Sequence, residues 1–117
     1  MKYVFIQYPK CSTCQKAKKW LDDNNIEYIS RHIVENNPSK EELHNWVTKS
    51  GLPIKKFFNT SGMLYKQMQL KDKLPNMTKE QQIEILSTNG MLVKRPLLIS
   101  DNVILIGFKE NEWKERV

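Results

Sequence analysis

The chain opens with a strand, a helix and a second strand. Residues 3–7 are a short apolar run of β-branched and aromatic types, which predicts a strand. Across residues 12–25 the apolar positions, Ala17 and Leu21 among them, recur at helical spacing. Residues 26–33 then mix apolar and polar residues as a second strand does. Because a strand that returns through a helix lies parallel to the first, the sequence predicts a β-α-β unit.

Two capping sequences predict helices in the middle of the chain. Ser39 is followed three residues later by Glu42, and Thr78 is followed by Gln81. At this spacing, each of the two side chains can accept a hydrogen bond from the backbone N–H of the other residue. These bonds satisfy backbone N–H groups that are free at the start of a helix. We expect helices that begin after Ser39 and Thr78, with short helices across residues 51–77 between them.

The last part of the chain predicts a hairpin and a closing helix. Residues 97–99 and 103–106 are apolar runs joined by Ser-Asp-Asn, a turn composition. Residues 109–117 have acidic residues early and Trp113 as their apolar anchor. The whole order predicts an α/β fold with a mixed four-stranded sheet, in a single domain over residues 1–117 with a helical insertion at about 39–90.

Length, charge and hydropathy exclude several classes of protein. The 117 residues suit one domain, and no run approaches the roughly 20 apolar residues of a membrane span. Without a secretory signal pattern at the start, we expect a cytoplasmic protein without a membrane partner. The net charge of +6 favours anionic partners only weakly, because the lysines are scattered and such charge is typical of a solvated surface.

The two cysteines, Cys11 and Cys14, lie where the first strand gives way to the first helix. Free backbone N–H groups and the helix dipole at that point favour a thiolate, and Lys10 adds a neighbouring positive charge. We therefore expect the pKa of Cys11 to lie below the usual value of about 8.5, which makes it the attacking thiol. Cys14 lies on the same helical turn and is the candidate resolving thiol.

Two other interpretations of the cysteine pair stay open. It could be half of a zinc site, but His32 and His44 have the wrong spacing for a zinc finger, so no metal is expected. It could also be inert core, although its polar surroundings disfavour that interpretation. Gln7 and Tyr8 could line the same site.

Arg95 and Pro96 precede the predicted hairpin. From the residues alone, a solvated arginine and a trans peptide bond are favoured.

Several segments together resemble the arsenate-reductase-like (ArsC) family, which includes the Spx transcriptional regulators. They are Cys11 with the helix QKAKKWLDDNNIEY, the FFNTSG stretch, KRPLLI at 94–99 and the ending ILIGFKENEW. The resemblance covers essentially the whole chain and implies a thioredoxin-like three-layer fold. It also implies a catalytic Cys11, an active-site Arg95 and a cis peptide bond before Pro96.

The family's arsenate reductases use two further arginines, and the matching positions here are Ser61 and Phe108. One arginine in place of three should hold a doubly charged oxyanion much more weakly, so we expect a poor arsenate reductase.

Two functions follow as hypotheses. The first is a thiol-disulfide oxidoreductase in which Cys11 attacks, Cys14 resolves and Arg95 holds the substrate. Lys10, Ser12, Thr13 and Pro96 would contact that substrate. No bound cofactor is expected, and glutathione or another thiol would supply electrons.

The second function is an Spx-like redox switch that binds RNA polymerase through a surface near residues 51–61, without direct DNA binding. The serine at position 61, where Spx has arginine, and the absence of a longer charged tail weigh against it.

Overall fold

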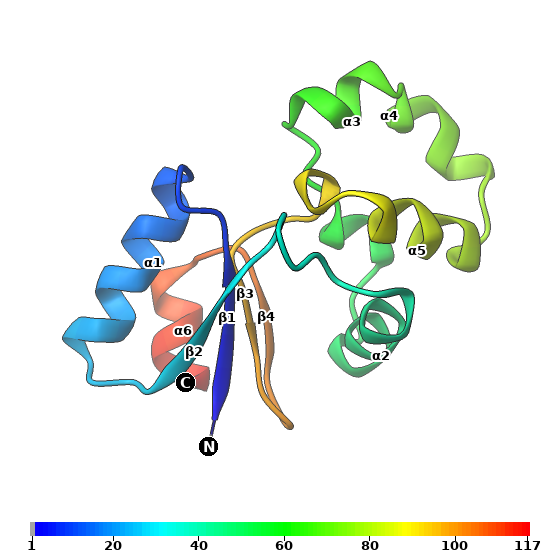
Figure 1. Ribbon diagram of the computed structural model, residues 1–117. Helices are drawn as coiled ribbons and strands as arrows, with labels where there is room; N and C mark the ends of the chain where they lie inside the picture. The colour runs from blue at the N-terminus through cyan, green and yellow to red at the C-terminus, as the bar shows by residue number, and fades with distance from the viewer. Residues whose placement is uncertain (1) are drawn as a thin grey trace. The chain divides into compact units, whose positions relative to one another are not determined.

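The computed structural model describes residues 2–117 and shows two compact units (Figure 1). One unit comprises the chain up to His32 together with Arg95–Val117, and the other comprises Ile33–Lys94. We call them the sheet unit and the helical unit. The helical insertion expected at about residues 39–90 lies within the helical unit.

The sheet unit contains one four-stranded sheet in the order β2-β1-β3-β4. Its first two strands are parallel and the other two pairings are antiparallel, which confirms the predicted mixed sheet. The elements of this unit are β1 (Tyr3–Gln7), α1 (Ser12–Asp23), β2 (Tyr28–His32), β3 (Leu97–Ile99), β4 (Ile104–Ile106) and α6 (Glu110–Arg116).

Helices α1 and α6 cover the same face of this sheet (Figure 1). In the register of the strands, Phe5 lies beside Leu98, so both side chains point to that face. They pack with Leu21 of α1 and with Trp113 of α6, and all four are fully buried. The indole Nε1 of Trp113 donates to the Gly107 carbonyl at 3.1 Å, which satisfies its one polar atom. This core fixes α1, and with it the cysteines, against the sheet.

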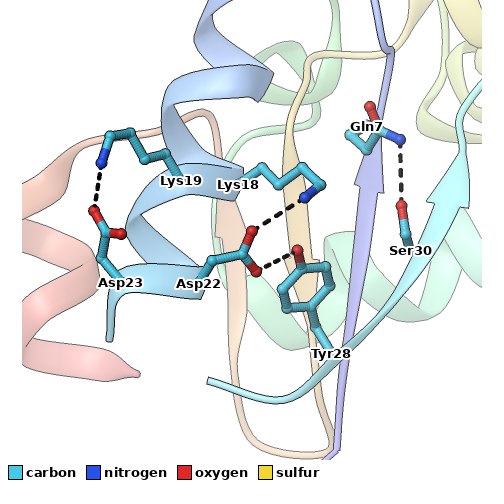
Figure 2. Close-up of polar contacts among 7 residues, drawn as sticks. All are labelled: Gln7, Lys18, Lys19, Asp22, Asp23, Tyr28 and Ser30. Carbon is cyan, nitrogen blue, oxygen red and sulfur yellow. Dashed lines mark hydrogen bonds and ion pairs between the residues drawn. The ribbon is translucent and has the colours of Figure 1, made fainter. Parts of the chain in front are cut away.

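Polar contacts add to the attachment of α1 (Figure 2). The hydroxyl of Tyr28 on β2 donates to Asp22 at 2.8 Å, and Lys18 forms an ion pair with the same carboxylate at 3.1 Å. Figure 2 also shows Gln7 of β1 donating to Ser30 of β2 at 3.2 Å. Because these groups are exposed, solvent screens them and each pair adds little stability.

The helical unit contains the two capped helices that the sequence predicted. Helix α2 (Lys40–Ser50) begins after Ser39 and helix α5 (Lys79–Thr88) after Thr78, each with a complete capping box. Gly51 ends α2 in the left-handed conformation, at φ 67°, which glycine adopts without steric cost.

Short helices fill the stretch between α2 and α5, as expected. They are the 3₁₀ helix η1 (Ile54–Phe57), α3 (Met63–Gln67), α4 (Leu70–Lys73) and the 3₁₀ helix η2 (Leu74–Asn76), and a further 3₁₀ helix, η3 (Gly90–Leu92), follows α5. Backbone hydrogen bonds join the segment at the end of η1 to the segment at the end of η3. The Asn59 N–H donates to the Leu92 carbonyl at 2.8 Å, and the Lys94 N–H donates to the Phe57 carbonyl at 2.7 Å.

Gly90 lies where two backbone segments meet. A Cβ atom at this position would overlap the carbonyl oxygen of Ile33. Only glycine fits there without a backbone shift. In the part of the chain that the structure describes, no helix is long and apolar enough to cross a membrane.

Candidate dithiol site

Cys11 is the N-cap residue of α1, with an extended backbone at φ −90° and ψ 119°. Its N–H donates to the Tyr8 carbonyl at 3.0 Å, and its carbonyl accepts from the Gln15 N–H at 3.1 Å. The Gln15 side chain also donates to the Pro9 carbonyl at 2.8 Å, which ties the loop back to the helix. Sequence analysis did not single out Gln15, because no motif marks a glutamine that bonds to a preceding loop. These bonds fix the position of the Cys11 sulfur.

The surroundings of Cys11 stabilise its thiolate. Partial burial raises the pKa, but the Cys14 backbone N–H, the Cys14 thiol, the Arg95 guanidinium and the Thr13 backbone N–H outweigh it, so the pKa lies below its ordinary value of 9.0. The first-turn N–H groups of a helix have no intrahelical acceptor, so they are free to act on an anion. The site therefore favours the nucleophilic form of Cys11.

Cys14 has the opposite environment. It is fully buried, and that burial, with the negative charge of Cys11 beside it, raises its pKa to about 12 against the weaker effect of a Tyr8 backbone hydrogen bond. Both cysteines are free thiols in the structure. A solvent-borne molecule can thus reach Cys11 but not Cys14.

Arg95 supplies the positive charge of the site. Its guanidinium carbon lies 5.2 Å from the centre of the Tyr8 ring, and its charge lowers the pKa of both cysteines. Its Nε and Nη1 atoms are buried without a hydrogen-bond partner. An unsatisfied buried donor costs about 1–3 kcal/mol, so the N–H groups on these two nitrogens favour an anionic or carbonyl acceptor.

The peptide bond between Arg95 and Pro96 is cis. The trans bond favoured from the residues alone is therefore wrong, and the cis bond that the family resemblance implied is confirmed. Sequence reasoning could not have found it, since most X-Pro bonds are trans and only the surrounding fold selects the isomer. Pro96 itself is buried, and its carbonyl accepts from the Gly107 N–H at 2.8 Å.

The other predicted site residues lie in the loop and first turn around Cys11. Lys10, Ser12 and Thr13 are all exposed. The charged group with the largest effect on Cys11 is Arg95 and not Lys10, the residue that the sequence suggests. Lys10 has the smaller effect on the pKa of Cys11 because it is exposed and solvent screens its charge. The buried nitrogen atoms of Arg95 are screened less.

The two positions that match the additional arginines of arsenate reductases carry no charge. The Phe108 ring packs edge-on against Trp113, with 4.9 Å between ring centres, so this side chain belongs to the aromatic cluster between α1 and α6. Ser61 is exposed and donates to Asn59 at 3.4 Å.

No metal-ligand set accompanies the cysteines within residues 2–117, where three or more His, Cys, Asp or Glu side chains nowhere gather.

The fold and the cysteine pair define a thioredoxin-like α/β protein with a dithiol at the start of its first helix. Residues 6–116 match the model of the ArsC family, and the chain belongs to that family.

Relatives of this chain include regulators and proteins with no assigned role. It is 50% identical over 98% of both chains to "Uncharacterized protein YusI" of Bacillus subtilis (strain 168). It is 30% identical to "Regulatory protein MgsR" of the same organism, over 93% of this chain and 85% of that one. Among solved structures, a "putative ArsC family related protein from Bacteroides fragilis" is 61% identical with a TM-score of 0.95, over 98% of this chain and 97% of that one.

Proposed function

We propose that this protein is a thiol-disulfide oxidoreductase in which Cys11 attacks and Cys14 resolves. The observation that carries the proposal is the asymmetry of the pair: Cys11 is accessible with a lowered pKa, while Cys14 is fully buried with a pKa of about 12. An attacking thiol must be ionised and reachable, and a resolving thiol needs only to reach its neighbour.

In the first step, the Cys11 thiolate attacks a disulfide R–S–S–R′. A bond forms between Cys11 Sγ and the sulfur of R, the S–S bond breaks, and R′S⁻ leaves. An unpartnered N–H group of Arg95 would hold an acceptor oxygen of the substrate beside the sulfur, and the substrate would also contact Lys10, Ser12, Thr13 and Pro96. A charged guanidinium donor suits a carboxylate or a peptide carbonyl.

In the second step, Cys14 gives its proton to the departing R′S⁻, and its thiolate attacks the Cys11 sulfur. RS⁻ leaves, and the protein holds a Cys11–Cys14 disulfide. The first step prepares the second, because it removes the negative charge on Cys11 that helps to raise the pKa of Cys14. Glutathione or another thiol then returns two electrons and restores the dithiol, without a bound cofactor. The proposal places the protein in the cytoplasm, where thiols stay reduced.

Arsenate does not fit this site well. Arg95 is the sole arginine at the three family positions, since Ser61 and Phe108 occupy the other two. A doubly charged oxyanion would therefore keep much of its charge unbalanced. We propose a disulfide as the substrate in its place.

The test is catalytic turnover of a small disulfide. The wild-type protein should accelerate reduction of bis(2-hydroxyethyl) disulfide by glutathione, measured through coupled NADPH oxidation, with many turnovers per molecule. Arsenate in the same assay should give far less turnover. If the protein gave no disulfide turnover while both thiols were intact, the proposed enzymatic function would be rejected.

A second candidate is a redox-sensing regulator, which the 30% identity to MgsR favours. Formation of the Cys11–Cys14 disulfide would then act once, as a switch, and the oxidised protein would bind RNA polymerase through residues 51–61. Pull-down of purified RNA polymerase by the oxidised but not the reduced protein would support this function, and equal retention of both forms would contradict it.

A further inference from the structure

The net charge of the chain is concentrated in one segment of the helical unit. Residues 43–79 contain seven lysines and a single acidic residue, Asp72, so this segment carries +6, which equals the net charge of the whole chain. In the remaining residues, the positive and negative charges are equal in number. The lysines are Lys49, Lys55, Lys56, Lys66, Lys71, Lys73 and Lys79.

These seven lysines are all exposed, and their charges are not neutralised. Within residues 2–117, no ion pair involves any of them. Outside this segment, three lysines are paired: Lys18 and Lys19 bind aspartates one turn along α1, and Lys40 binds Glu84. The unpaired lysines therefore produce a positive field that an acidic partner would neutralise.

A small apolar pocket lies within this charged segment. Its volume is about 200 Å³. Ile54 of η1, Tyr65 of α3 and Leu74 of η2 line it together with Lys55 and Lys71. The Gln82 side chain of α5 also lines the pocket, and it donates to the carbonyl oxygens of Leu74 and Met77 at 3.4 Å and 3.2 Å. These bonds hold one wall in place.

The volume of the pocket indicates the size of its occupant. Sites for cofactors and drug-sized molecules usually measure about 300–1,000 Å³. A pocket of about 200 Å³ is better matched to one large side chain, and anchoring side chains of this kind carry much of the free energy of protein–protein binding.

We propose that this pocket and the lysines around it bind an acidic polypeptide segment of a partner protein, with one large apolar or aromatic side chain seated between Lys55 and Lys71. Carboxylates that flank the anchor would neutralise the lysines. The proposal rests on the pocket and the charge distribution and does not depend on the thiol chemistry.

A nucleic acid fits these observations less well. Binding of single strands relies on exposed aromatic rings for base stacking. The large hydrophobic side chains exposed in residues 2–117 are Ile29, Val34, Leu52 and Met63, none of them aromatic. The larger groove between α2 and α5 is also a weaker candidate for an acidic partner, because two acidic side chains, Glu41 and Glu80, line it.

The test uses fluorescence anisotropy with a short labelled peptide of Glu and Asp residues that carries one central Trp. A matched peptide has Ser in place of Trp. The double variant Lys55→Gln/Lys71→Gln removes the two pocket lysines, and Lys16→Gln/Lys114→Gln removes the same charge from exposed positions on α1 and α6.

We expect the Trp peptide to bind more tightly than the Ser peptide. The pocket variant should lose about tenfold in affinity for the Trp peptide, the sum of two partly exposed charge contacts, while the control variant stays near wild type. Three results would each overturn the proposal: equal binding of the two peptides, equal losses in both variants, or tighter binding of an oligothymidylate strand or of phosphatidylserine vesicles than of the Trp peptide.

Discussion

The two units use positive charge in different ways. In the sheet unit, one largely buried guanidinium, that of Arg95, acts on a single thiolate from a fixed position. In the helical unit, seven exposed lysines form no ion pair among the described residues, and two of them, Lys55 and Lys71, line an apolar pocket. A charge in a buried site has a strong effect at short range, whereas exposed charges are screened and act together. We therefore expect a single change at Arg95 to have a large effect on the chemistry of Cys11, and a single change at one of the exposed lysines to have a small effect on binding.

The largest expected effect is at Cys11. Cys11→Ser should reduce disulfide turnover by at least about 100-fold, because it removes the nucleophile of the first step. Steady-state rates with bis(2-hydroxyethyl) disulfide give the measurement. The matched control is Lys114→Gln, at an exposed position on α6 outside the proposed site. Turnover by Cys11→Ser within a few-fold of wild type would remove Cys11 from the mechanism.

Gly90→Ala tests the helical unit. The added Cβ would overlap the Ile33 carbonyl oxygen, so we expect a loss of about 1–3 kcal/mol in the free energy of unfolding. Urea denaturation followed by circular dichroism measures it. Gly51→Asn is the comparison, since Gly51 has open space around it and asparagine tolerates a positive φ. A Gly90→Ala protein as stable as wild type would show that the two segments separate easily.

Arg95→Gln should raise the pKa of Cys11, because it removes the positive charge that stabilises the thiolate. The alkylation rate with iodoacetamide, measured against pH, should then rise at higher pH than in wild type. Lys10→Gln, which removes an exposed charge from the preceding residue, should shift the profile less. A larger shift from Lys10→Gln than from Arg95→Gln would restore the role that the sequence suggested for Lys10.

The lowered pKa of Cys11 also makes stability depend on pH. The folded pKa is below the unfolded value of 9.0, so the thiolate adds stability that is fully present above pH 9 and is lost as the pH falls through the folded pKa. The difference in unfolding free energy between wild type and Cys11→Ser should therefore change in favour of wild type as the pH rises. A difference that is constant from pH 6 to pH 10 would contradict a lowered pKa.

The smallest of these effects is at Ser39. Ser39→Ala should cost about 1 kcal/mol of stability, because it removes the acceptor for the Glu42 N–H at the start of α2. Denaturant midpoints measure the loss, and Ser39→Asp should recover most of it. Wild-type stability in Ser39→Ala would mean that packing alone sets the start of this helix.

Local signals made some of the structure predictable. Both capping boxes lie within four residues of sequence, and the structure confirms the helices that begin at Ser39 and Thr78. The strand at residues 3–7 and the hairpin also follow from short apolar runs, although β4 begins at Ile104, one residue later than predicted. The short helices between α2 and α5 were expected only in outline, because contacts distant in sequence, such as the Asn59 to Leu92 hydrogen bond, determine their bounds.

In the candidate site, too, local features could be predicted from the sequence and contacts between distant residues could not. The position of Cys11 before a helix, with Cys14 on its first turn, could be predicted because it depends on neighbouring residues. The contact of Arg95 with Tyr8 could not, because it joins the end of β1 to a residue more than eighty positions away through the pairing of β1 and β3. The unpartnered N–H groups of Arg95 are likewise visible only in three dimensions.

The most direct test of the account is the fate of a disulfide reagent on each cysteine. The reduced protein is mixed with 5,5′-dithiobis(2-nitrobenzoate), and intact mass is measured together with release of thionitrobenzoate. We predict that wild type releases two equivalents and keeps no adduct, that Cys14→Ser keeps one adduct on Cys11, and that Cys11→Ser reacts slowly. A stable adduct on wild type, or faster reaction at Cys14 than at Cys11, would contradict the assignment of Cys11 as the attacking thiol and Cys14 as the resolving one.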